Sequence, residues 1–457
     1  MKQKSPWLYE LNRTREERSL QENHACDVLI VGGGIAGLMT AFFVLTYTDK
    51  EVVLAEAGRV AHGATGHNGG QMVSYFEKSF AGLVKRYGLT LATRAQADIL
   101  SAWDLLKEVQ EKAQLTTPVH QFQAYSAYAS MPHLLEALEN RYWLKEAGLL
   151  TEQVLIASGD PRIQDIPERY KDLYSLVPKG MLLDRLETDN QEFFAASTAQ
   201  RGVTNSARLT EELAGYLLKQ FPKRFKLLEK TPIVSLKLQK EEAIGLNQEA
   251  LEIRSKKVVL CTNGFEKIKI YNDDGPDIDT RFHHLVSGIV GYMCGYTEEP
   301  KHKATAISYH GYHENISSEN GIEPYFYLTR RPFIGNRSLV TLGGPEWAVE
   351  DTTAYDKEAH VYPKQAADAL NSFLVHNYIK APKVIDYSFQ WHGLMGYTPS
   401  SLRCIGPEPL NPTLMYNLGC NGTGILSSIF GAKKIADFLI HGKQEASLFD
   451  PGISGEY

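Results

Sequence analysis

The chain has 457 residues, of which 43% are hydrophobic and 22% charged, and its formal net charge is −6 at pH 7. This length predicts two or three domains, and the composition excludes a disordered chain. The acidic balance gives no reason to expect nucleic acid or an anionic membrane as a partner.

The N-terminal residues, the most apolar run and the cysteines bear on where in the cell the protein is located. Residues 1–25 are polar and lack the apolar core of a signal peptide, so we expect a surface arm over residues 1–20. The most apolar run, residues 28–48, contains three consecutive glycines, which favours a strand, a turn and a helix over an integral membrane segment. We therefore expect a cytoplasmic protein. The scattered cysteines predict reduced buried thiols and no metal site: Cys26, Cys261, Cys294, Cys404 and Cys420.

A nucleotide-binding pattern begins at residue 26. "CDVLIV" has the short, β-branched character of a buried parallel strand, and "GGGIAG" follows it directly. A helical pattern then runs over residues 35–46, and a second strand, "EVVLAEA", reaches Glu56. Strand, glycines, helix, strand and acid together match the dinucleotide fingerprint in its expected structural context.

Each part of the fingerprint has a mechanical role. Gly32 permits the tight turn, Gly34 lets the backbone approach a pyrophosphate, and Gly37 lets helix and strand pack closely. The acid accepts hydrogen bonds from a ribose, which favours NAD or FAD over NADP but leaves those two open. The predicted contacts are Gly32, Gly34, Ile35, Ala36, Gly37, Glu56 and Ala57.

A glycine-rich loop, "GATGHNGGQ", follows at residues 63–71. With the fingerprint, it resembles the D-amino-acid oxidase-like superfamily of FAD enzymes, and is most similar to the gamma-glutamylputrescine oxidase group. The resemblance implies FAD, with the loop lying against the flavin. His67 departs from the motif, because close relatives carry Arg there. The matching residues are Gly63, Ala64, Thr65, Gly66, Asn68, Gly69, Gly70 and Gln71.

Two later segments extend the resemblance. "KKVVLCTNGF", residues 256–265, is similar to the strand after which the family's chain leaves the FAD domain, and residues 391–439 resemble the family's closing signature. "LMYNLG" predicts a strand, "CNGTG" a turn, and residues 425–441 a helix whose first amides stabilise negative charge on the flavin. The implied FAD contacts are Thr262, Asn263, Gly264, Gly396, Gly422, Thr423, Gly424 and Ile425.

The resulting fold class is α/β (α+β overall), with a Rossmann-type FAD-binding domain and a second, mostly antiparallel-sheet substrate domain. Residues 205–221 form an amphipathic helix, and "KLLEKTPIVSLKLQ" predicts a strand whose Val234 contacts the adenine. The alternation in "VHQFQAYSAYAS", "YFYLTRRPF" and "SLVTLGGPE" predicts antiparallel strands of the substrate sheet. The expected divisions are an arm (1–23), the FAD domain (24–90, 200–270 and 385–442), the substrate domain (91–199 and 271–384) and a tail (443–457).

The resemblance also implies a reaction. In the family, a hydride leaves a carbon that bears an amine, the imine hydrolyses, and the electrons pass to oxygen or another acceptor. The expected partner is therefore a small-molecule amine or amino acid. Two alternatives stay open: an FAD dehydrogenase of hydroxy acids that uses a quinone or carrier, and a flavoprotein that keeps the fold for assembly without catalysis.

Candidate substrate contacts come from the presumed sheet and the closing segment. Tyr325 and Tyr327 share one strand face, and Arg330, which can hold a carboxylate bidentately, falls on the other. Both faces cannot line one pocket, so at least one of these candidates should fail. Trp391 and His392 either cap the flavin or belong to the core.

Covalent attachment of the flavin is a separate question. In monomeric sarcosine oxidases a cysteine tethers the flavin, but the matching position here is Met395, so Cys404 is expected to be structural. In dimethylglycine and sarcosine dehydrogenases a His at the position of His67 carries the flavin. Here we expect His67 to substitute for the family's Arg by hydrogen bonding, with attachment as the alternative.

Overall fold

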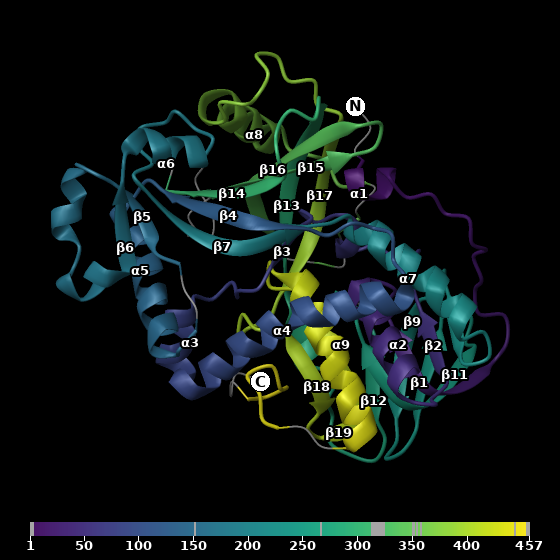
Figure 1. Ribbon diagram of the computed structural model, residues 1–457. Helices are drawn as coiled ribbons and strands as arrows, with labels where there is room; N and C mark the ends of the chain where they lie inside the picture. Colours follow the sequence, from purple (N-terminus) through teal and green to yellow (C-terminus); the bar gives the residue numbers. More distant parts are fainter. Residues whose placement is uncertain are drawn as a thin grey trace.

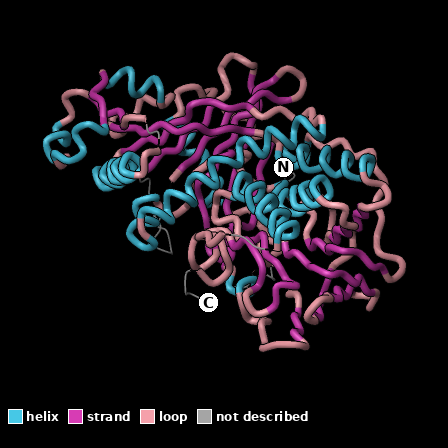
Figure 2. The backbone as a smooth tube through the Cα atoms, turned by 60° about the horizontal axis from the view of Figure 1, so that its bottom comes forward, coloured by secondary structure: helices cyan, strands magenta, loops and turns pink. Residues whose placement is uncertain are grey.

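Two β-sheets organise the molecule. The computed structural model describes residues 4–149, 152–265, 267–311, 325–349, 352, 355–356, 359–442 and 445–453. In Figure 1 one sheet occupies the upper half and the other the lower right, with the helices α2, α4, α7 and α9 beside the lower one. Figure 2 shows helices crossing the middle of the molecule, with strands on either side. Within the described residues, no helix is long and apolar enough to cross a membrane.

The first sheet carries the fingerprint, and its centre is parallel. Its central strand runs parallel to both neighbours, and residues 28–31 are buried because helices and strands cover both sheet faces. In order, the strands are β12 (Lys269–Asn272), β9 (Ile233–Leu238), β10 (Ala243–Asn247), β11 (Glu252–Leu260), β1 (His24–Val31), β2 (Val52–Ala55) and β8 (Phe225–Leu228), while β19 (Asn411–Leu418) pairs with β11 and β18 (Cys404–Glu408).

The second sheet is mostly antiparallel, as expected; of its pairs, β14–β4 and β5–β6 are parallel. Two of its strands, β3 and β17, come from segments that the sequence assigned to the FAD domain. In order, the strands are β17 (Phe389–Tyr397), β13 (Ser287–Glu298), β16 (Arg337–Val349), β15 (Phe326–Phe333), β14 (Thr305–His310), β4 (His120–Tyr128), β7 (Ala195–Val203), β5 (Val154–Ala157) and β6 (Tyr174–Val177), and β3 (Gln71–Val73) pairs with β7.

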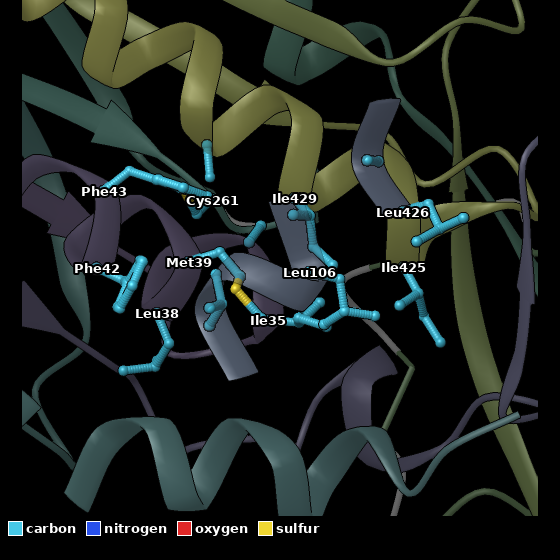
Figure 3. Close-up of a cluster of buried hydrophobic side chains, with 14 of the residues drawn as sticks. Ile35, Leu38, Met39, Phe42, Phe43, Leu106, Cys261, Ile425, Leu426 and Ile429 are labelled. Carbon is cyan, nitrogen blue, oxygen red and sulfur yellow. The ribbon is translucent and has the colours of Figure 1, made fainter. Parts of the chain in front are cut away.

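The helices tie the two sheets together. The helix after the fingerprint is apolar on all sides, and accordingly its residues 35–45 are all buried. Figure 3 shows Ile35 and Met39 of this helix in one cluster with Leu106 of α4 and Ile429 of α9. The helices are α1 (Pro6–Tyr9), α2 (Ile35–Tyr47), α3 (Phe80–Tyr87), α4 (Leu89–Ala113), α5 (Met131–Glu146), α6 (Lys179–Arg185), α7 (Ser206–Gln220), α8 (Lys364–Asn377) and α9 (Gly424–His441).

The N-terminal segment is exposed or half-buried over residues 8–19, but it is anchored at its start. Trp7 is fully buried and packs edge-on against Trp391, with the ring centroids 6.3 Å apart. Arg15 donates hydrogen bonds to Glu211 and Glu229. One aromatic anchor and a few ion pairs therefore dock a segment whose average composition is polar. From α1 the chain runs down the edge of the molecule to β1 (Figure 1).

A correction concerns "KLLEKTPIVSLKLQ", which forms two strands, β8 and β9, on opposite sides of the first sheet's central strands. Lys230 between them has φ +50°, a left-handed conformation that ends an extended run. The carboxylate of Glu229 also accepts a hydrogen bond from the amide of Val60, which holds the bend in place.

Candidate active site

A cavity of about 470 Å³ lies where the fingerprint meets the second sheet, and most of the predicted cofactor residues line it. Its size is typical of ligand and cofactor pockets. The predicted cofactor residues that line it are Gly32, Gly34, Ile35, Ala36, Glu56, Ala57, Gly63, Ala64, Thr65, His67, Asn68, Gly69, Gln71, Thr262, Asn263, Gly422, Thr423, Gly424 and Ile425. Those outside the lining are Gly37, Gly66, Gly70, Val234, Gly264 and Gly396.

The fingerprint turn has little room for side chains. Gly32 has φ +111°, and a methyl group there would lie 2.6 Å from the carbonyl oxygen of Cys261. At Gly37 a methyl group would lie 1.9 Å from the carbonyl oxygen of Gly32. Gly37 therefore acts through the packing of α2 on β1, while Gly32 and Gly34 border the cavity itself.

An acidic group marks the end of β2, where the fingerprint expects a ribose. The carboxylate of Glu56 accepts hydrogen bonds from the amides of Gly33 (2.6 Å) and Gly58 (2.8 Å). These amides fix the carboxylate at the cavity wall. The position fits a group that binds ribose hydroxyls.

The loop of residues 63–71 is held by its own asparagine and by α1. The Asn68 amide donates to the carbonyl oxygens of Ala64 (3.1 Å) and Thr65 (2.9 Å). Its side-chain oxygen accepts from the amide of Gly70 at 2.7 Å. The indole of Trp7 donates to the Asn68 carbonyl oxygen. A strongly fixed backbone is what a preformed cofactor cradle requires.

The glycines of this loop divide into two kinds. A methyl group at Gly63 would meet no protein atom within 4 Å, so this glycine faces open cavity. At Gly66 a methyl group would lie 2.4 Å from the Ala61 carbonyl oxygen and 2.7 Å from a Leu8 side-chain carbon, and at Gly70 it would lie 2.5 Å from the Trp7 ring. Gly66 and Gly70 therefore make room for the N-terminal segment, which sequence reasoning did not foresee.

Two helices begin at the cavity. The residues at the starts of α2 and α9 line it, and neither helix start has a hydrogen bond from its N-cap side chain. Thr65 from the loop accepts instead from the amide of Ile35 at 3.0 Å. The remaining first-turn amides and the two helix dipoles favour negative charge, which fits a pyrophosphate at one helix and an electron-rich ring system at the other.

Three predicted contacts are displaced. Ile233 lines the cavity, whereas its neighbour Val234 lies outside the lining and is 37% exposed. Gly264 and Gly396 are packing positions. A methyl group at Gly264 would lie 2.5 Å from the side chain of Val286, and one at Gly396 would lie 2.5 Å from the Asn263 carbonyl oxygen.

His67 lies in the middle of the loop. Its Nδ1 lies 3.0 Å from the carbonyl oxygen of Gly63, and its side chain borders the main cavity. It also borders a second cavity of about 490 Å³, which Tyr355 lines as well. Met395, at the position of the sarcosine oxidase tether, lines the main cavity.

The far end of the cavity is built from side chains of the second sheet. Tyr325 and Tyr327, both predicted, line it with ring centroids 5.6 Å apart. Glu77, Glu346 and Tyr397 join them. Burial raises the pKa of Glu77, and burial together with the charge of Glu77 raises the pKa of Glu346 to about 8.

Arg330 does not reach this cavity, which corrects its assignment to substrate binding. It is 1% exposed, and its guanidinium donates to the Glu187 carboxylate at 2.6 and 2.8 Å. Tyr378 and the carbonyl oxygen of Lys303 accept from it as well. Strand alternation sends Arg330 to the face opposite Tyr327, so the expected failure of one candidate falls on the arginine.

His392 is also outside the lining, and the core interpretation holds for it and for Trp391, which are each 2% exposed. The hydroxyl of Tyr355 lies 2.7 Å from His392 Nδ1, and the His360 ring centroid lies 4.7 Å from that of His392. Burial, together with the charges of His360 and His67, lowers the pKa of His392 to about 4. The neutral ring suits a packing role outside the cavity.

Sequence reasoning missed the acidic residues of the site. Glu346 is the only charged residue in "SLVTLGGPE", an otherwise buried strand, and that isolation was a usable signal. Glu77 lies in a polar loop after β3 and gave none. Only the pairing of β13 with β16 and of β3 with β7 brings these segments to one cavity.

Comparison with known proteins gives consistent results. A family model described as FAD dependent oxidoreductase matches residues 27–438. Gamma-glutamylputrescine oxidoreductase of Escherichia coli (strain K12) is 33% identical over 97 residues, or 21% of this chain and 22% of that protein. The chain thus matches about a fifth of the length of its curated relatives.

Two solved structures share the fold. Glycine oxidase from Geobacillus kaustophilus has a TM-score of 0.66 at 16% identity, and the match covers 94% of this chain and 99% of that one. L-proline dehydrogenase from P. horikoshii has a TM-score of 0.67 at 14% identity, and covers 94% and 97%.

Proposed function

Because the chain belongs to the FAD-dependent oxidoreductase family, we propose that it oxidises the C–N bond of a small amine or amino acid. The family confirms the resemblance and the FAD cofactor that the glycine motifs predicted, and with them an oxidoreductase. When bound, FAD accepts a hydride from the carbon that bears nitrogen, and water then hydrolyses the imine.

The observation that carries the proposal is that two chemically different sets of residues line one cavity. Loop residues 63–71 and the starts of α2 and α9 offer backbone amides, which suit the cofactor. Tyr327, Tyr397 and Glu346 offer an aromatic and acidic surface, which suits a small organic substrate.

The division of labour among segments is part of the proposal. The first sheet with its helices would hold FAD, and the second sheet would cover the substrate. A gamma-glutamyl amine is the substrate that the 97-residue match suggests, since the relative's name specifies gamma-glutamylputrescine. Oxygen or another acceptor would then take the electrons.

An anaerobic titration tests the proposal. The purified yellow protein is mixed with polyamines, their glutamyl conjugates, amino acids and hydroxy acids, and loss of the oxidised flavin absorbance is followed. We expect amines or amino acids to bleach the flavin. Bleaching by hydroxy acids alone, or by nothing in the panel, would contradict the proposal. Oxygen uptake compared with dye reduction then identifies the acceptor class.

A further inference from the structure

Two carboxyl groups face the same space at the substrate end of the cavity. Glu77 follows β3 and lies near the start of α9. A methyl group at Gly422 would be only 2.9 Å from a Glu77 carboxylate oxygen. Glu346 lies on β16 opposite Gly291, where a methyl group would be 3.9 Å from the Glu346 side chain and 3.8 Å from the Tyr327 hydroxyl. Both residues line the cavity.

Among the described residues, no cation lowers the pKa of either acid. Several carboxylates elsewhere are neutralised: Glu187 pairs with Arg330, Glu229 with Arg15, and Glu408 with Arg281. Glu346 is half-buried and Glu77 is exposed at the cavity wall, and two neighbouring carboxylates without a counter-ion repel one another. Such a pair is typical of a site whose counter-ion is a ligand.

Aromatic rings complete the space around the acids. Tyr325, Tyr327 and Tyr397 line the same cavity, and burial, with smaller contributions from the charges of Glu346 and Glu77, raises the pKa of all three tyrosines. The faces of tyrosine rings attract cations, and the carboxylates add direct ion pairing. The electrostatic character of this end therefore favours a positive ligand.

The cavity lining offers few cationic side chains that could bind a substrate carboxylate. Of the described arginines and lysines, only Arg403 lines the cavity. Its guanidinium already donates to the side chain and the carbonyl oxygen of Asn417, at 2.6 and 2.8 Å. Arg201 lies behind the wall, where it donates to Ser308 at 2.9 Å.

We propose that Glu77 and Glu346 form the subsite for the ammonium group of the substrate, and that the enzyme prefers amines to amino acids with a carboxylate beside the nitrogen. The inference rests on the proposed function and names its substrate class. Glu346 also takes the proton that makes the amine reactive: R–CH₂–NH₃⁺ and carboxylate become R–CH₂–NH₂ and carboxylic acid.

Three probes of one shape test the subsite in the FAD-loaded protein. Tert-butylammonium, pivalate and tert-butanol differ in charge, and the amine cannot be oxidised because its carbon bears no hydrogen. Binding is measured by calorimetry and by the flavin absorbance shift. We expect tert-butylammonium to bind at least about tenfold more tightly than either other probe, as charge-assisted hydrogen bonds imply.

Variants assign that selectivity to the pair. Glu346→Gln and, independently, Glu77→Gln should each weaken tert-butylammonium binding by about tenfold or more while FAD content stays unchanged. Glu139→Gln, an exposed position on α5, is the matched control and should leave binding unchanged. Absence of tert-butylammonium binding, equally tight pivalate binding, or unchanged binding in both pair variants would overturn the inference.

The two proposals fail in different ways. If amines bleach the flavin but both glutamate variants bind tert-butylammonium as tightly as the parent does, the proposed subsite is wrong and the proposed amine oxidation stands. If the probe binds as expected but no amine bleaches the flavin, the proposed function is wrong.

Discussion

The two ends of the main cavity are built by opposite means. The residues assigned to the cofactor are mostly backbone amides and glycines from short continuous stretches, as at residues 32–37 and 63–71. At the substrate end, side chains from separate strands converge, among them Tyr327, Tyr397 and Glu346. The first kind of site is specified locally by sequence, whereas the second exists only once the sheet has formed.

The largest effects on FAD binding are expected from substitutions of the glycines. Gly37→Ala should abolish FAD binding and destabilise the fold, by about 3 kcal/mol or more, because its methyl group overlaps the Gly32 carbonyl oxygen. Gly63→Ala should keep the apoprotein's melting temperature and lose FAD affinity, since its methyl group enters open cavity. Gly215→Ala on α7, where a methyl group meets nothing within 4 Å, is the control and should stabilise by about 0.5 kcal/mol. Flavin-to-protein ratio and thermal melts measure all three; normal flavin content in Gly37→Ala would contradict the account.

The next largest effect is a loss of stability, without a loss of substrate binding, on substitution of Arg330 in β15. Arg330→Met should destabilise the protein by about 3–5 kcal/mol, because it leaves the Glu187 carboxylate buried without its bidentate partner. The flavin bleaching rate of the folded fraction should stay unchanged, since Arg330 faces away from the cavity. Chemical denaturation and anaerobic mixing give the two quantities. A raised KM with unchanged stability would restore Arg330 as a substrate contact.

A pH-dependent stability difference is expected at the substrate end. The pKa of Glu346 is raised to about 8, so the folded state holds this proton more tightly than the unfolded one, and the associated stability is lost as pH rises from about 4.5 through 8. Facing groups are Glu77 and the tyrosines at 325, 327 and 397, whose own pKa values are raised. Glu346→Gln should therefore be more stable than the parent by about 3 kcal/mol at pH 9, and equal to it near pH 4. An equal stability difference between Glu346→Gln and the parent at pH 9 and at pH 4, measured by melting curves, would contradict this.

The smallest effect is expected at His67. His67→Ala should retain FAD with at most about a tenfold weaker affinity, because one neutral hydrogen bond contributes about 1 kcal/mol. Acid precipitation should release all the flavin from the parent protein. Yellow fluorescence that stays with the denatured parent chain, and is lost in His67→Ala, would instead establish covalent attachment.

The contrast also explains what the sequence could predict. The fingerprint, the loop and the α9 turn were readable because glycine conformations and strand–helix spacing are local. Arg330, Val234 and His392 lie outside the cavity lining, which the sequence could not show because strand register and facing direction depend on distant pairing. The anchoring of the N-terminal arm was unpredictable for a related reason, since the burial of Trp7 depends on Gly70 and Trp391, which are far along the chain.

The most direct measurement is single-turnover flavin reduction by an amine substrate in the parent protein, Glu346→Gln and Glu139→Gln at equal FAD content. The account predicts complete bleaching in the parent and in Glu139→Gln, and a rate about 100-fold lower in Glu346→Gln, as for loss of a positioned proton acceptor. Equal rates in all three proteins, or no bleaching in the parent by any amine, would contradict it.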